Sequence, residues 1–153
     1  MVTFLADAVA LALTNVHAGQ LPFGALVVRD GEILATGVNT TLRGGDPTAH
    51  AEVEAIRAAC RALGTLRLEK AEVYTSCEPC AMCQAVGVAA GITRMTFAAS
   101  SAEAADHGLP ADALSARMQV AWRDAHPAFL TQGAVDGAIA PFGAWLRERT
   151  GGR

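Results

Sequence analysis

The chain has 153 residues, of which 52% are hydrophobic and 18% are charged, and its formal net charge is −3. A length of about 100–200 residues is typical of one domain, and this much apolar surface excludes intrinsic disorder as the main state. The slightly negative charge argues against a broad nucleic-acid-binding surface, which needs clustered lysine and arginine. We therefore expect one domain over residues 1–153 and no nucleic-acid partner.

The first half of the chain reads as a helix, a hairpin and a second helix. Apolar spacing predicts the first helix, and two β-rich runs joined by an Asp-Gly pair predict the hairpin: Thr3–Val16, then Phe23–Arg29 and Glu32–Val38. Thr48 is expected to cap the second helix, which runs to about Leu63.

In the second half, strands alternate with helices. The expected strands are Ala71–Ser76 and Arg94–Ala99, and the expected helices are 79–91, starting at Pro79, then Ala102–His107, Ala111–Trp122 and Pro141–Thr150. This order predicts an α/β fold, a mixed sheet with helices on both faces.

The sequence predicts neither a membrane segment nor secretion. The apolar stretch from Phe4 to Val16 is too short to cross a bilayer, and no lysine or arginine precedes it, as a signal peptide would require. Three of the four cysteines, Cys77, Cys80 and Cys83, are close together, which favours metal binding over disulfide bonds. We expect the protein to lie in the reducing cytoplasm, with no membrane partner.

Two short motifs carry candidate chemistry. One is His50-Ala51-Glu52 at the start of the second helix, and the other is Pro79-Cys80-Ala81-Met82-Cys83 at the start of the third. Cys80 and Cys83 are three residues apart, so both thiols leave one face of the first helical turn. If His50 joins them, three ligands hold a zinc ion and a fourth position stays open for water, as in catalytic zinc sites. Glu52 could then move protons.

Non-catalytic interpretations are weaker. Cys80 and Cys83 could form half of a structural zinc knuckle, with His50 and Cys77 as the remaining candidate ligands. Cys77 ends a strand, however, and fits better as a small buried residue. A zinc-stabilised scaffold would also have no use for the carboxylate of Glu52.

These motifs resemble the cytidine deaminase superfamily, whose signature is H-x-E followed by P-C-x-x-C. The resemblance implies a three-layer α/β/α fold around a five-stranded mixed sheet. It also implies Zn²⁺ on His50, Cys80 and Cys83, with Glu52 as the proton shuttle in a hydrolytic deamination that releases ammonia.

Longer segments resemble the branch that holds bacterial guanine deaminases and tRNA adenosine deaminases: Pro22–Ala25, Asp46–Glu52 and Thr75–Cys80. Ser76-Cys77 and the tail Pro141–Trp145 are more similar to guanine deaminase. This resemblance implies that Asn39 binds a substrate carbonyl, that the backbone of Ala51 borders the base, and that Phe23 belongs to the same substrate-binding set.

The substrate ring is left open by one departure. Guanine deaminases place a second acid at the position that falls on Ala111 here, with Asp112 next to it. Asp112 is therefore the candidate for that role, with free guanine favoured and cytosine or another pyrimidine or s-triazine ring as the alternative. A tRNA adenosine deaminase is a further alternative, but it would need a basic surface.

The C-terminal tail is a candidate lid. The guanine-deaminase tail that residues 141–145 resemble crosses to a partner subunit, so residues 141–153 are expected to be exchanged in a homodimer, with Trp145 closing over the base. The alternative is that Phe142 and Trp145, spaced for one helical face, pack on their own subunit.

Overall fold

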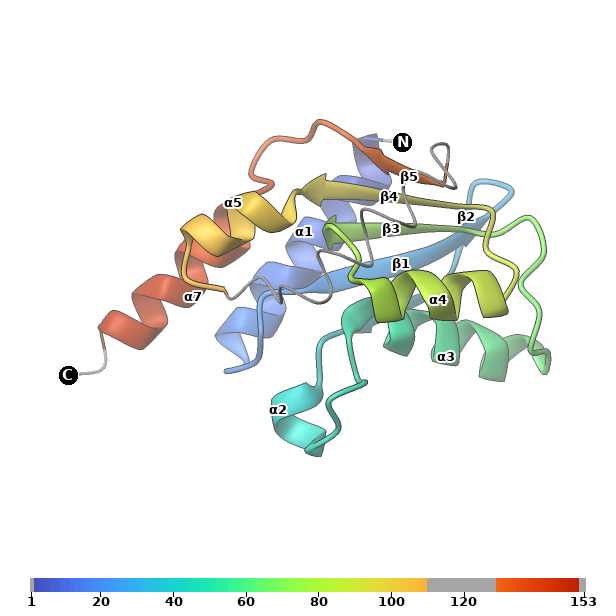
Figure 1. The fold of residues 1–153 in the computed structure, drawn as a ribbon, viewed down its shortest axis with the longest axis horizontal. Helices are drawn as coiled ribbons and strands as arrows, with labels where there is room; N and C mark the ends of the chain where they lie inside the picture. The colour runs from blue at the N-terminus through green and yellow to red at the C-terminus, as the bar shows by residue number, and fades with distance from the viewer. Residues whose placement is uncertain (1, 110–128, 152–153) are drawn as a thin grey trace.

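A computed structural model describes residues 2–109 and 129–151 (Figure 1). Among these residues, every helix is too short or too polar to cross a membrane. A five-stranded sheet in the order β2-β1-β3-β4-β5 forms the centre. Its strands are β1 (Gly24–Arg29), β2 (Glu32–Val38), β3 (Glu72–Cys77), β4 (Arg94–Ala99) and β5 (Leu130–Gln132).

The sheet is mixed, as expected. β1 pairs antiparallel with β2 and β3, whereas β3–β4 and β4–β5 are parallel. The β1–β2 hairpin turns at Asp30 and Gly31, which have φ of 54° and 80°. Two consecutive positive φ angles are what a tight hairpin turn needs, and an Asp-Gly pair adopts them readily.

Helices cover both faces of the sheet, which confirms the α/β/α class (Figure 1). The helices are α1 (Val2–His17), α2 (Thr41–Gly44), α3 (Ala51–Leu63), α4 (Ala81–Ala89), α5 (Ser101–Asp106) and α7 (Ala140–Thr150). Alternate residues of β1 point to opposite faces of the sheet, so the strand supplies two buried side chains to each face. Ala25 and Val27 pack in the cluster under α3 and α4, whereas Leu26 and Val28 pack under α1.

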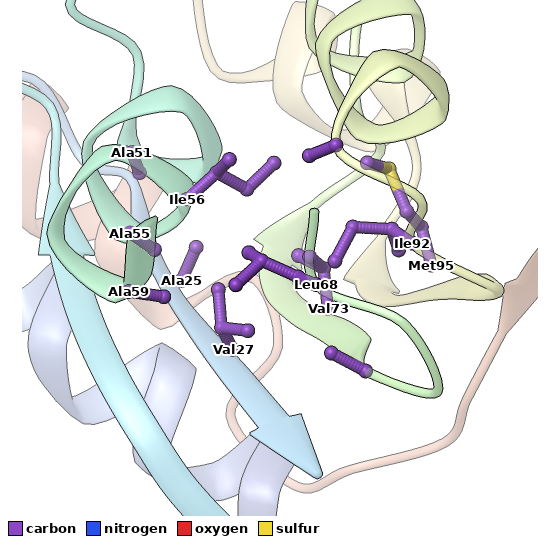
Figure 2. Packing of buried hydrophobic residues seen from close by; sticks show 12 residues of the cluster. Ala25, Val27, Ala51, Ala55, Ile56, Ala59, Leu68, Val73, Ile92 and Met95 are labelled. Carbon is purple, nitrogen blue, oxygen red and sulfur yellow. The ribbon is translucent and has the colours of Figure 1, made fainter. Parts of the chain in front are cut away.

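Small side chains let α3 lie close to the sheet. Ala51, Ala55 and Ala59 of α3 face Ala25 of β1 (Figure 2). On β2, a Cβ added at Gly37 would overlap the backbone of Ala51 and Ala55. The start of α3 is therefore held directly against the end of β2.

Two predicted helix starts are wrong by a few residues. Thr48 does not cap α3, because its amide and hydroxyl both donate to Asp46 Oδ1 in a turn, at 2.8 and 2.7 Å. The N-cap of α3 is His50. Likewise Cys80, not Pro79, borders α4, which ends at Ala89.

Two short elements escaped prediction. α2 has four residues, and β5 is a three-residue edge strand whose side chains are at most half-buried. Neither is long enough to show a hydrophobic period. The helix expected at Ala111–Trp122 lies outside the described residues.

Candidate active site at the sheet edge

Three metal-ligating side chains meet where β2 and β3 end. Nδ1 of His50 lies 3.6 Å from Cys80 Sγ and 3.5 Å from Cys83 Sγ, and the two sulfur atoms are 3.6 Å apart. His50 and Cys80 are the N-caps of α3 and α4, both with extended backbone, and Cys83 follows in the first turn of α4. The loops after β2 and β3 thus bring two helix starts together.

The three distances fit a zinc ion. A tetrahedral zinc with bonds of about 2.0 Å to nitrogen and about 2.3 Å to sulfur keeps its ligand atoms about 3.5–3.8 Å apart. The observed separations of 3.5–3.6 Å lie at this spacing. Three protein ligands leave one tetrahedral position, the arrangement of catalytic zinc sites.

The electrostatics of the cluster favour a thiolate. The pKa of the Cys80 thiol is lowered to about 4. The largest cause is the hydrogen bond between Cys80 and Cys83, and the hydrogen bond between Cys80 and His50 also lowers it. The contact between Cys80 and Cys83 raises the pKa of Cys83, with burial as the second cause, and the bond to Cys80 raises the pKa of His50. Because zinc ligation needs deprotonated sulfur, metal binding must release the protons that the cluster holds.

Glu52 reaches the same cluster from the first turn of α3. Its Oε2 accepts from Cys83 Sγ at 3.4 Å, and its Oε1 accepts from the Thr75 hydroxyl at 3.3 Å. The residue is only 7% exposed, and this burial raises the pKa of the carboxyl. A carboxyl whose protonated form is favoured by burial is suited to taking up and returning a proton.

The expected substrate residues Asn39, Ala51 and Phe23 lie at this edge. Asn39 follows β2 and is 2% exposed, and its Oδ1 accepts from the amide and the hydroxyl of Thr41 at 3.1 and 2.7 Å. Ala51 is the buried first residue of α3. Phe23 precedes β1, and its carbonyl accepts from the amide of Asn39 at 3.1 Å.

Two other expected residues have different outcomes. Asp112 lies outside the described residues. Trp145 is half-buried on α7 and packs, with Phe142, against a cluster that includes Cys77 and Ala99. Phe142 is fully buried, and its ring centroid lies 6.0 Å from that of Phe23 in the same chain.

Cys77 and Thr75 complete the site's surroundings. Burial raises the pKa of Cys77, and its thiol faces the carbonyl of Ser100 at 4.0 Å. Sequence reasoning missed Thr75, which contacts Glu52. Its inward position on β3 was the available signal, because alternate residues of a strand share a face.

Known proteins are similar to this chain in sequence and in fold. The family described as the cytidine and deoxycytidylate deaminase zinc-binding region matches residues 2–99. The guanine deaminase of Bacillus subtilis is 49% identical over 107 residues, which are 69% of this chain and 69% of that protein. A solved structure of the Bacillus subtilis guanine deaminase covers 94% of this chain and 91% of its own at 38% identity, with a TM-score of 0.69.

A second group of relatives is also similar. The tRNA-specific adenosine deaminase of Aquifex aeolicus is 42% identical over 96 residues, 63% of this chain and 64% of that protein. Both groups carry deaminase names, and the family match includes all three zinc ligands and Glu52. The chain therefore belongs to the cytidine and deoxycytidylate deaminase family of zinc-dependent hydrolases.

Proposed function

We propose that this deaminase acts on free guanine, adding water at the carbon that bears the amino group and releasing xanthine and ammonia. The observation that carries the proposal is the buried amide of Asn39 at the sheet edge that holds the zinc ligands. The similarity to guanine deaminase supports it.

Asn39 is oriented to donate to the base. Because a backbone N–H can only donate, the Asn39 atom facing the amide of Thr41 is the oxygen. The amide group then presents Nδ2 as its donor. Such a donor matches the C6 carbonyl of guanine. Adenine has no carbonyl to offer it, and its one amino group is the group that would have to face the zinc.

Glu52 handles the protons of the reaction. Zinc, when bound, acts as a Lewis acid and lowers the pKa of water. The carboxylate of Glu52 takes a proton from the attacking water and returns it to the departing amine. The Thr75 hydroxyl donates to its Oε1, so one carboxylate oxygen is held while the other, which faces Cys83, is left to exchange the proton.

The assembly is a second part of the proposal. We expect one domain over residues 1–153, a cytoplasmic homodimer, and exchange of residues 141–153 between subunits. The rings of Phe142 and Phe23 already pack together, and exchange would form the same contact across the dimer. Trp145 would then shield the reacting base from bulk water.

Removing residues 141–153 tests whether this segment is an exchanged lid or a core element of its own subunit. If residues 141–153 act as an exchanged lid, a chain ending at Ala140 should keep its zinc and melting temperature, lose most activity, and sediment differently. If α7 is a core element of its own subunit, loss of the fully buried Phe142 should lower the melting temperature first.

Ammonia release from a panel of bases tests the substrate. The panel holds guanine, cytosine, an amino-s-triazine, guanosine, and a tRNA anticodon stem-loop with adenosine at the wobble position. We expect kcat/KM to be highest for guanine. Faster turnover of cytosine or the triazine would contradict the proposal. Turnover of the stem-loop, with affinity falling steeply as salt is added, would favour the tRNA alternative, which the net charge of −3 argues against.

A further inference from the structure

Asn15 is a buried polar residue whose side chain reaches out of α1 to two loops. It is 3% exposed. Its Nδ2 donates to the carbonyl of Leu21 at 2.8 Å and to the carbonyl of Asn39 at 2.9 Å. Both amide hydrogens of one side chain are therefore used on backbone oxygens, one before β1 and one after β2.

The two carbonyls belong to segments that form the wall of the site. The carbonyl of Leu21 also accepts from the amide of Phe23 at 2.9 Å, and the carbonyl of Phe23 accepts from the amide of Asn39 at 3.1 Å. Asn15 thus closes a ring of hydrogen bonds that contains two residues of the expected substrate-binding set, Phe23 and Asn39.

A further backbone hydrogen bond connects this ring to the residue before a zinc ligand. After Asn39, the amide of Thr40 donates to the carbonyl of Ala49 at 3.0 Å, and Ala49 precedes His50. The segment between β2 and α3, which contains α2, is therefore anchored at its start by Asn15 and ends at the zinc ligand His50. A shift at the anchored start would move the Asn39 amide relative to the metal.

We propose that Asn15 is a positioning residue: it sets the place of Asn39, and through it the affinity for the base, without contacting substrate. This rests on the substrate role proposed above for Asn39. The positioning itself is a property of the loop and has its own structural readout.

The chemistry of the position is demanding. Aspartate has the same shape as asparagine but would set its oxygens against two carbonyl oxygens. Serine has one hydroxyl hydrogen and could serve only one of them. Because water has little access to a site that is 3% exposed, the lost hydrogen bonds would not be replaced.

The test compares Asn15→Ser and Asn15→Asp with Thr14→Ala, an exposed neighbour on the same helix. With zinc content unchanged, we expect KM for the best base of the panel to rise about tenfold in Asn15→Asp and less in Asn15→Ser, with kcat within about threefold. Thr14→Ala should match the parent. A fall in kcat with KM unchanged would overturn the proposal.

Amide hydrogen exchange gives a readout that needs no activity. The amide of Thr41, which donates to Asn39 Oδ1, should exchange faster in Asn15→Ser, while the amides of Val27 and Val73 in the sheet keep their protection. Uniform loss of protection would mean a general structural role and would overturn the proposal, as would no change at Thr41. If Asn15→Asp does not fold, Asn15→Ser carries the test.

A double-mutant cycle with Asn39→Ala separates this inference from the proposed function. If Asn15 acts through Asn39, its substitution should raise KM little further in the Asn39→Ala background. Additive effects would refute the positioning role. If Asn39→Ala alone leaves KM unchanged for every base, the substrate role of Asn39 fails, and faster exchange at Thr41 still reports whether Asn15 holds the loop.

Discussion

The starts of α3 and α4 differ from the start of α5 in how their N-caps are used. Ser100 caps α5 in a complete capping box: its hydroxyl accepts from the amide of Glu103, whose carboxylate accepts from the amide of Ser100. The N-caps of α3 and α4 are His50 and Cys80, and neither side chain forms a capping hydrogen bond. The N-cap side chain of α5 stabilises its helix, whereas the N-cap side chains of α3 and α4 face a possible zinc site.

This difference shows what the zinc site costs the fold. A capping side chain is worth about 1 kcal/mol, and two helices forgo it. What they gain is a pair of side chains aimed out of the helix ends at one point. The free N–H groups of a helix start also favour negative charge, which suits the thiolate of Cys80. Metal binding then stabilises the fold where caps are missing.

Removing a ligand should have the largest effect. Cys83→Ala leaves two of three protein ligands, so we expect less than stoichiometric zinc, no measurable deamination and a lower melting temperature. Metal analysis and thermal unfolding check this. Cys60→Ala is the matched control, because Cys60 is half-buried and outside the ligand cluster. Full zinc retention in Cys83→Ala would refute its assignment as a ligand.

Replacing the proton shuttle should separate chemistry from ligation. Glu52→Gln preserves the shape of the side chain but cannot carry the proton, so activity should fall by about 10²–10⁴-fold while zinc and fold are kept. The control is Glu54→Gln, on the same helix, whose carboxylate is paired with Arg57 at 2.7 Å. Parent-like turnover by Glu52→Gln would show that another group moves the proton.

The sequence predicts which side chains could bind zinc better than it predicts where the helices that carry them begin. The H-x-E and P-C-x-x-C spacings pick out the three side chains that the structure brings together as a possible zinc site, because residue type and spacing limit which groups can share a metal. They do not reveal that His50 and Cys80 stand at N-caps, since Thr48 and Pro79 are equally good sequence signals for a helix start. Asp46 accepts a hydrogen bond from the hydroxyl of Thr48, which is therefore not used to cap the helix. This choice of partner depends on the conformation of the loop.

Tertiary contacts account for the remaining gaps. β5 is recognisable only through its pairing with β4, because three residues carry no period. Thr75 and Asn15 donate hydrogen bonds to partners 23 and 24 residues away in sequence, Glu52 and Asn39 respectively. No local pattern encodes such pairs.

Breaking the structural cap should have the smallest effect and leave the zinc site untouched. In Ser100→Ala the amide of Glu103 loses its acceptor, so the free energy of unfolding should fall by about 1 kcal/mol, with unchanged zinc content and KM.

This loss of unfolding free energy should depend on pH. Hydrogen bonds first from the amide and then from the hydroxyl of Ser100 lower the pKa of Glu103, so this stabilisation is present above the ordinary glutamate pKa and is lost as pH falls through the lowered value. Urea unfolding of both proteins, at neutral pH and at the most acidic pH where zinc is still bound, should therefore show the difference shrinking. A pH-independent cost would mean that the hydroxyl does not act through the carboxylate of Glu103, and loss of zinc would mean that this cap and the ligating starts are not independent.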